Sequence, residues 1–129
     1  RETVLAEKFE AMVDLGMANS RLKDFYDLWV LARSFPFQGS VVCAAIQATF
    51  ERRQTPLPLE VPLALTEAFS GDEGKRTQWN AFLKNGNLGR MPLEDPVLHL
   101  RGFLWPPMEA IANKRNFSHE WKPGGPWKM

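Results

Sequence analysis

The sequence predicts an all-α protein, a compact bundle of about six helices followed by an irregular C-terminal tail. Apolar residues recur at spacings of three and four in successive segments, which is typical of amphipathic helices. No stretch shows the alternation of a half-buried strand over a useful length. With 129 residues, 44% of them hydrophobic, the chain is long enough to bury one core. We expect a helical domain over residues 1–113 and a separate tail over residues 114–129.

Two helices joined by a short polar turn form the predicted centre of the bundle. The first carries apolar residues between Val4 and Met17 along one face. Asn19 and Ser20 then interrupt, and either side chain can cap the second helix by accepting a backbone N–H bond. The second helix, Arg21 to about Arg33, is apolar on most sides, which predicts a buried central position.

Four further helical segments follow the central pair, separated by Pro-rich or Gly-rich stretches. A loop containing Pro36 ends the central helix, because proline disfavours a helical residue before it. The predicted segments are Val41–Arg53 with Ser40 as its cap, Leu63–Ser70, Thr77–Lys84 after a turn bracketed by Gly71 and Gly74, and a helix from about Leu93 that Pro106-Pro107 ends, with a last short turn over Met108–Asn113.

The tail from Lys114 onward combines cations with aromatic rings. Phe117, Trp121 and Trp127 argue against free disorder, since disordered segments are usually poor in aromatic residues. Two interpretations stay open: the tail docks onto the helical body, or its cations and rings meet a partner such as single-stranded nucleic acid.

Composition narrows the classes of function. The formal net charge of +1 provides no global field, so a nucleic-acid partner would need a local basic patch. Cys43 is the single cysteine and cannot form an internal disulfide; without a recognisable signal peptide we expect a reducing cytoplasm. No apolar run approaches the roughly 20 residues that cross a bilayer, so we expect no membrane partner. His99 and His119 are too isolated to predict a metal site.

Two carboxylates on the central helix mark the candidate site. Asp24 and Asp27 are three residues apart and therefore share a helix face. Because an unpaired buried charge is costly, they need cationic partners, and the candidates are Lys8, Arg21 and Lys23. From spacing alone, Lys8 with Asp24 is explained by a structural ion pair between neighbouring helices.

The same residues carry a family resemblance. Glu7-Lys8 followed by Arg21-Leu22-Lys23-Asp24-Phe25-Tyr26-Asp27-Leu28 resembles the AbiEii/AbiGii family of nucleotidyltransferase toxins, and Thr49–Arg53 and Gln78–Leu83 fit the same family. The resemblance covers the chain up to about Met108. It implies the helical part of a nucleotidyltransferase toxin from a toxin–antitoxin or abortive-infection phage-defence system, forming one wall of a nucleotide cleft.

The resemblance also assigns roles to residues. It implies that Lys8 contacts the phosphates of a bound nucleoside triphosphate and that Asp24 lies in the same cleft and fixes Lys8, as the catalytic pair. From the residues themselves, two interpretations of Arg21 stay open: a second, forked contact to phosphate, or a solvated position in the hinge. Tyr26 and Asp27 are read as structural, with a place in the cleft as the alternative.

The metal-binding part of the family is not found in this sequence. Members carry a Gly-Ser turn followed by an Asp-x-Asp pair, whereas Gly39-Ser40 is followed here by Val41-Val42. We therefore expect a carboxy-terminal part of a longer enzyme, inactive alone, with no metal site of its own. The intact enzyme would hold Mg²⁺ through ligands outside this chain.

Partners follow from the same reasoning. The resemblance implies a nucleoside triphosphate, an RNA acceptor and an antitoxin protein, and an exposed face around Lys8 and Asp24 predicts a homodimer. The alternative function is a helical interaction module that binds an antitoxin protein or RNA.

Overall fold

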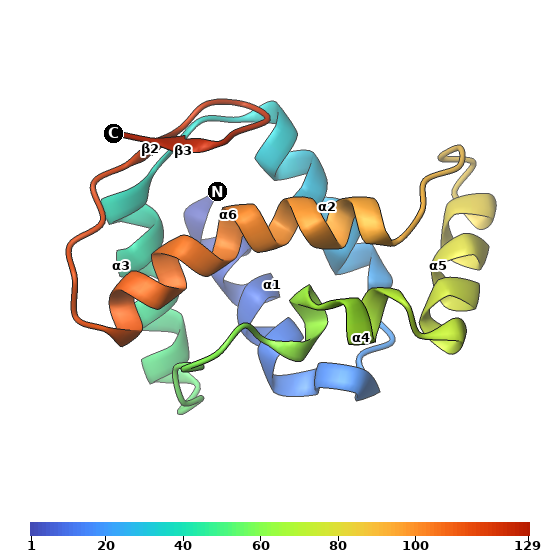
Figure 1. The fold of residues 1–129 in the computed structure, drawn as a ribbon, viewed down its shortest axis with the longest axis horizontal. Coiled ribbons are helices and arrows are strands. Elements are labelled where there is room, and N and C mark those ends of the chain that lie inside the picture. Colours follow the sequence, from blue (N-terminus) through green and yellow to red (C-terminus); the bar gives the residue numbers. More distant parts are fainter.

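The structure is a computed structural model that covers residues 1–129, and it confirms the predicted class of six α-helices (Figure 1). The helices are α1 (Glu2–Leu15), α2 (Leu22–Ser34), α3 (Gly39–Arg52), α4 (Glu67–Ser70), α5 (Glu73–Asn85) and α6 (Glu94–Ala112). Two 3-10 turns, η1 (Gly16–Ala18) and η2 (Leu63–Leu65), connect them. Three two-residue strands complete the fold: β1 (Phe37–Gln38), β2 (Glu120–Trp121) and β3 (Trp127–Lys128).

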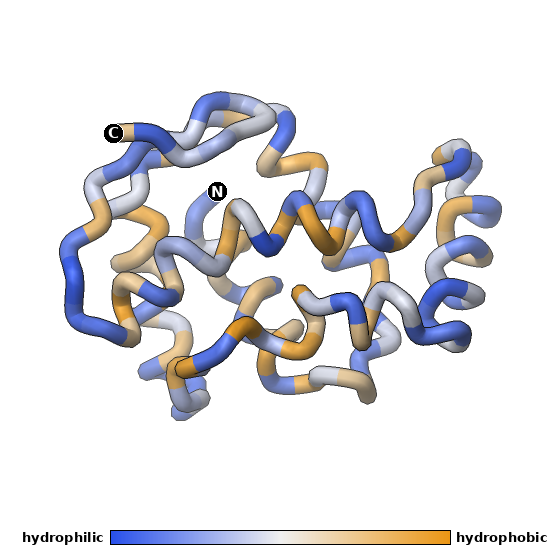
Figure 2. Tube along the Cα trace, viewed as in Figure 1, coloured by the Kyte–Doolittle hydropathy of each residue, from blue (hydrophilic) through white to orange (hydrophobic).

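One hydrophobic core lies between α1, α2, α3 and α6. Helix α1 packs along α3, and α6 packs against both α2 and α3. In Figure 1, α6 crosses the middle of the molecule, with α5 at one end and the tail at the other. Figure 2 shows hydrophobic and hydrophilic residues interspersed along the helices. The residues that each of these four helices buries are mainly hydrophobic. The largest rings of the core are Phe9, Phe25, Phe50, Phe69, Trp79 and Phe103, all fully buried.

None of the helices combines the length and hydrophobicity that crossing a lipid bilayer requires.

Helix α6 runs straight through Pro106-Pro107, so the prediction that these prolines end it was wrong, as was a separate turn over Met108–Asn113. Proline lacks the N–H that would bond to the carbonyl four residues earlier. For Pro107 that carbonyl belongs to Phe103, and the indole Nε1–H of Trp127 donates to it at 2.8 Å. The tail thus supplies the donor that the proline lacks, and the helix continues.

The same exchange occurs at the end of α2. Pro36 ends this helix at Ser34, as predicted, and leaves the Ala32 carbonyl without its usual partner. The Nε1–H of Trp121 donates to that oxygen at 2.7 Å, and the Gly124 N–H donates to it at 2.9 Å. Two tryptophans of the tail therefore satisfy two carbonyls that prolines of the body leave open.

The tail docks onto the body, which decides between the two interpretations left open by the sequence. Strands β1, β2 and β3 form an antiparallel sheet in that order, with Trp121 opposite Phe37 and opposite Trp127. The tail is therefore not irregular throughout, although strands of two residues are too short to leave an alternating pattern in the sequence. A Cβ at Gly39 would overlap the Phe117 ring and the His119 carbonyl, so glycine permits this close approach.

Helices α2 and α3 do not have the side-chain caps that the sequence predicted. The Asn19 side chain accepts the N–H of Arg21 at 2.8 Å, one residue before α2, and neither Asn19 nor Ser20 caps the helix. Helix α3 begins at Gly39, whose N–H donates to the His119 carbonyl, so Ser40 lies inside the helix and is not its cap.

The fourth and fifth helices also shift. Thr66 is extended and breaks the predicted Leu63–Ser70 segment into η2 and α4. Helix α5 begins four residues earlier than predicted, because the Asp72 side chain caps it by accepting the Lys75 N–H at 2.9 Å. Gly74 accordingly lies in the first turn of α5 and does not bracket a loop.

Candidate functional site

The first turns of α2 bring two carboxylates to one lysine of α1, and we call this group the α1–α2 site. The ammonium Nζ of Lys8 lies 2.8 Å from Asp24 Oδ1 and 3.2 Å from Asp27 Oδ2. The spacing of three residues places both carboxylates on the face of α2 that meets α1. The Asp24 side chain is only 7% exposed, whereas those of Lys8 and Asp27 are about a quarter exposed.

Two outer cations approach the same carboxylates from the solvent side. Arg21 Nη2 lies 3.2 Å from Asp24 Oδ2, and Lys23 Nζ lies 2.7 Å from Asp27 Oδ2. Both side chains are more than half exposed, and such surface pairs contribute about 0–1 kcal/mol. Asp24 Oδ2 has no aligned hydrogen bond, so Arg21 is held by charge alone and can turn to another anion.

The cluster fixes the charges of its members. Partial burial alone would lower the pKa of Lys8, but hydrogen bonds and attraction from Asp24 and Asp27 outweigh it and raise that pKa above its ordinary value. For Asp27, burial would raise the pKa, but Lys23 and Lys8 outweigh it and lower that pKa. Lys8 is therefore a permanent cation at neutral pH, and Asp27 a permanent anion.

Arg53 is a cation beside this site that the sequence reasoning did not select. It follows α3, and its Nη1 lies 2.9 Å from Oε1 of Glu10, while Nη2 lies 3.2 Å from Oε2 of Glu7. Buried Glu10 also accepts a 2.6 Å hydrogen bond from Thr55. The sequence predicted Arg53 as the last residue of a helix. The segment Thr49–Arg53, which also fits the family resemblance, was the pattern that could have indicated its place near the site.

Lys8, Arg21 and Arg53 line one shallow pocket between these elements. Glu7 supplies its single carboxylate, and the remaining lining residues are Val4 and Ala11. Its volume of about 280 Å³ lies just below the roughly 300–1,000 Å³ of small-molecule sites. The pocket is therefore large enough for a small anionic group and smaller than most sites that hold a whole ligand.

Tyr26 lies outside this pocket, although it is next to Asp27 in sequence. Its ring packs 5.7 Å from Trp29 within α2, and 6.4 Å and 5.8 Å from Trp79 and Phe82 of α5, measured between ring centroids. Tyr26 thus joins α2 to α5 through aromatic contacts.

The residues of the α1–α2 site do not fit a magnesium ion. Mg²⁺ requires near-octahedral oxygen ligands, but Asp24 and Asp27 are both engaged with cations. No group of three His, Cys, Asp or Glu side chains converges anywhere in the structure. No catalytic step through a metal is therefore derived from these residues.

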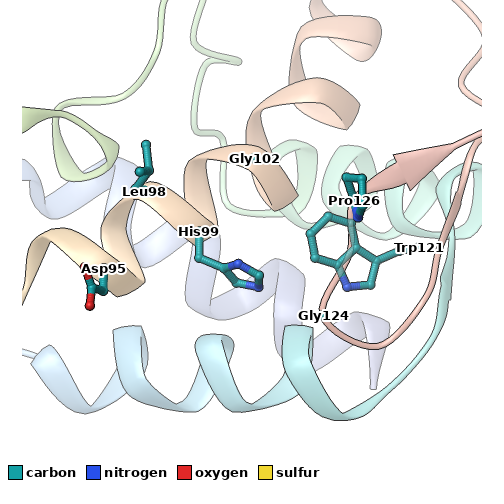
Figure 3. Close-up of a pocket in the computed structure, with 7 residues that line it drawn as sticks. All are labelled: Asp95, Leu98, His99, Gly102, Trp121, Gly124 and Pro126. Carbon is teal, nitrogen blue, oxygen red and sulfur yellow. The ribbon is translucent and has the colours of Figure 1, made fainter. Parts of the chain in front are cut away.

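The two histidines and the cysteine occupy other environments. His99 lies on α6 and packs edge to face against Trp121 of the tail, with 5.7 Å between the ring centroids, and both residues line an open hollow (Figure 3). Burial, together with the charge of nearby Arg33, lowers the pKa of His99. Burial raises the pKa of Cys43 to about 11, so its thiol stays protonated and unreactive at neutral pH.

Comparison with known proteins gives one match. The model of the family described as nucleotidyl transferase AbiEii toxin, type IV toxin–antitoxin system, matches residues 1–113, which end one residue beyond α6. The search of curated proteins gave no match, and neither did the search of solved structures.

Proposed function

We propose that this chain, which belongs to the AbiEii nucleotidyl transferase toxin family of type IV toxin–antitoxin systems, forms one wall of the toxin's nucleotide cleft. In this proposal the pocket formed by Lys8, Arg21 and Arg53 receives the phosphates of a nucleoside triphosphate. Transfer of the nucleotide to an acceptor would then act in toxicity and in defence against phage.

The observation that carries the proposal is the bonding of the Lys8 ammonium. An ammonium has three N–H donors; one donates to Asp24 Oδ1 at 2.8 Å, and Asp27 Oδ2 lies within ion-pair distance at 3.2 Å. Even with both carboxylates in contact, one N–H is left for a phosphate oxygen in the pocket that Lys8 lines. The two carboxylates keep Lys8 charged and hold it in one orientation, so it acts as an aimed point charge.

The two arginines add positive charge beside Lys8. Arg21 is 58% exposed and its contact with Asp24 Oδ2 lies near solvent, whereas Arg53 is 41% exposed and is held at the pocket by its 2.9 Å contact with buried Glu10. Each guanidinium can offer phosphate a forked pair of N–H donors. Phosphoryl transfer depends on such positioning and neutralisation of charge, which is the contribution we assign to this chain.

The remaining chemistry belongs to other residues in the proposal. We propose that Mg²⁺ ions of the intact enzyme are held by carboxylates outside residues 1–129, and that the 129-residue chain alone is inactive. Labelled nucleotide transfer to RNA and to protein, measured with added Mg²⁺, tests this. Robust transfer by the chain alone would show that the site is misplaced.

The role of Lys8 is tested in the intact toxin. Lys8→Ala is expected to abolish nucleotide transfer and toxicity while the circular dichroism spectrum stays helical. The matched control is Lys23→Ala, because Lys23 also contacts Asp27 but is 71% exposed and does not line the pocket. If the Lys8→Ala toxin kept full activity, Lys8 would not be the phosphate-binding residue and the proposal would be wrong.

Two partner proposals remain to be tested with the chain itself. Titration with a nucleoside triphosphate, RNA and a cognate antitoxin protein distinguishes the nucleotide wall from the alternative, a helical interaction module. Light scattering tests the proposed homodimer, whose contact would include Val4, an apolar residue 45% exposed at the edge of the pocket.

A further inference from the structure

A basic groove lies between α5 and the loop over residues 86–92, away from the lining of the Lys8 pocket. Its volume is about 800 Å³, and its charged lining consists of Arg76, Lys84 and Arg90. Asn80 and Asn87 add polar groups, and no carboxylate lines it. Because the whole chain has a formal net charge of +1, three cations on one concave surface are a local concentration of charge.

The cations of the groove lack firm partners within the chain. Arg76 is the one that contacts a carboxylate, with Nε 3.9 Å from Glu94 Oε1, a distance at which the pair is loose. Lys84 and Arg90 form no ion pair. All three side chains are exposed. They are available to an external anion without first breaking a strong internal contact.

The groove is held in shape by contacts of its loop with α5. The Trp79 indole donates to the Met91 carbonyl at 2.7 Å, and Leu88 N–H donates to the Leu83 carbonyl at 3.0 Å. Trp79 is fully buried, which fixes the far end of the loop. A preformed groove needs little ordering when a ligand enters it, which favours binding.

The spacing of the donors indicates a linear polyanion. Arg76, Asn80 and Lys84 follow one another at intervals of four, so they form a row along one face of α5. At 1.5 Å per residue the row extends about 12 Å. A stacked strand carries one negative charge for about every 3.4 Å of its length, so the row of donors matches roughly three to four nucleotides.

We propose that this groove binds a single-stranded nucleic acid, as the docking site of the acceptor in nucleotidyl transfer. The cations contact phosphates, and the two asparagine amides can donate to and accept from sugars and base edges. Met91, half-buried, and Pro92, exposed, form apolar lining that suits base and sugar faces, which a single strand exposes and a duplex hides. The proposal rests on the proposed function for the identity of the strand as acceptor.

Binding of a fluorescent 12-nucleotide oligouridylate, followed by anisotropy, tests the groove without catalysis. With three phosphate contacts, affinity should fall roughly 20-fold between 50 and 200 mM salt. The triple variant Arg76→Gln, Lys84→Gln, Arg90→Gln should bind at least tenfold more weakly and lose most of this salt dependence. The replaced side chains are exposed, and circular dichroism checks that the variant folds.

A matched control removes the same charge elsewhere. Lys114→Gln, Lys122→Gln, Lys128→Gln, all exposed residues of the tail, should leave binding unchanged. Equal loss in both triple variants would reduce the effect to net charge and overturn the proposal, as would unchanged binding by the groove variant. If polyglutamate or duplex RNA bound more tightly than the oligouridylate, the proposal of a single-stranded nucleic acid would be overturned. Lys8→Ala should bind the oligonucleotide normally, which separates this outcome from failure of the nucleotide proposal.

Discussion

Two regions join segments that are far apart in sequence, but by different forces. One is the α1–α2 site; the other, which we call the tail dock, comprises Trp121, Trp127 and the carbonyls they bond. Lys8 is held by two carboxylates at 2.8 and 3.2 Å, and Arg21 and Lys23 complete the cluster from solvent. In the tail dock, indole N–H groups bond to backbone carbonyls at 2.7 and 2.8 Å. The Trp121 ring packs tilted against Phe103, with 4.5 Å between centroids, and the Trp127 ring stacks on Phe103 at 5.8 Å.

The α1–α2 site can therefore exchange its ion-pair partners for other ions or water, whereas the tail dock cannot exchange its hydrogen-bond partners. Ion pairs near solvent contribute little, and water or phosphate can replace either member at small cost. A buried carbonyl without a donor costs about 1–3 kcal/mol, so each indole bond is strongly retained. The contrast predicts that changes in the tail dock act on stability, and that changes in the α1–α2 site act mainly on binding.

The largest expected effect is on the tail dock. Trp121 is 3% exposed, and Trp121→Ala should lower the free energy of unfolding by about 3–5 kcal/mol, as for other buried aromatic residues. Urea denaturation followed by circular dichroism measures it. Trp121→Phe keeps a smaller aromatic ring and removes the N–H, and because Gly124 N–H still bonds to the Ala32 carbonyl, the lost hydrogen bond should cost about 0.5–1.5 kcal/mol and the total loss should stay below that of Trp121→Ala. Equal losses in the two variants would show that the ring packing is unimportant.

Gly39→Ala should come next, because the tail must move to admit a methyl group. The added Cβ would overlap the Phe117 ring and the His119 carbonyl, which predicts a loss of about 1–3 kcal/mol, measured in the same way. Gly102→Ala is the control: its Cβ meets open space inside α6, and the replacement should stabilise by about 0.5–1 kcal/mol. A tail that tolerated Gly39→Ala without loss would not be docked as the structure has it.

Asp24→Asn should have an effect on stability no larger than that of Gly39→Ala, and a larger effect on nucleotide binding. The substitution preserves shape but leaves Lys8 with Asp27 alone, and we expect a loss of about 1–3 kcal/mol. Asp27→Asn is the matched change, and since Asp27 is 28% exposed it should cost about 0–1 kcal/mol. Titration of the nucleotide into both variants should show the weaker binding for Asp24→Asn. The reverse order would make Asp27 the residue that holds Lys8.

The fold was largely predictable because helix periodicity is a local signal. The apolar spacing located both ends of α1 and α2 and the start of α6 within a few residues. The path through Pro106-Pro107 was not predictable, because it depends on Trp127, which lies twenty residues away in sequence and donates to the Phe103 carbonyl. The strands of the tail were hidden for a similar reason, since two-residue strands depend on pairing and leave no pattern.

The candidate site shows the same limit. The i, i+3 spacing of Asp24 and Asp27 predicted a shared face, and the structure brings Lys8 and Arg21 to that face. Arg53 was missed because its position depends on the packing of α3 along α1, which no local pattern encodes.

The smallest expected effect is a pH dependence of stability that comes from His99, which contacts the tail dock through Trp121. His99 faces Trp121, with Arg33 of α2 nearby and Asp95 one turn earlier on α6. Its pKa is lowered by folding, so between the folded value and the ordinary 6.5 the unfolded chain binds more protons, and stability is lost as pH falls through this window. The midpoint of urea unfolding should therefore decrease from pH 7 to pH 5, and His99→Gln should reduce that decrease. Asp27 has a lowered pKa as well, but its contribution is lost only below its ordinary value of 3.8, outside this range. If His99→Gln left the slope unchanged, the acid sensitivity would have to come from another group.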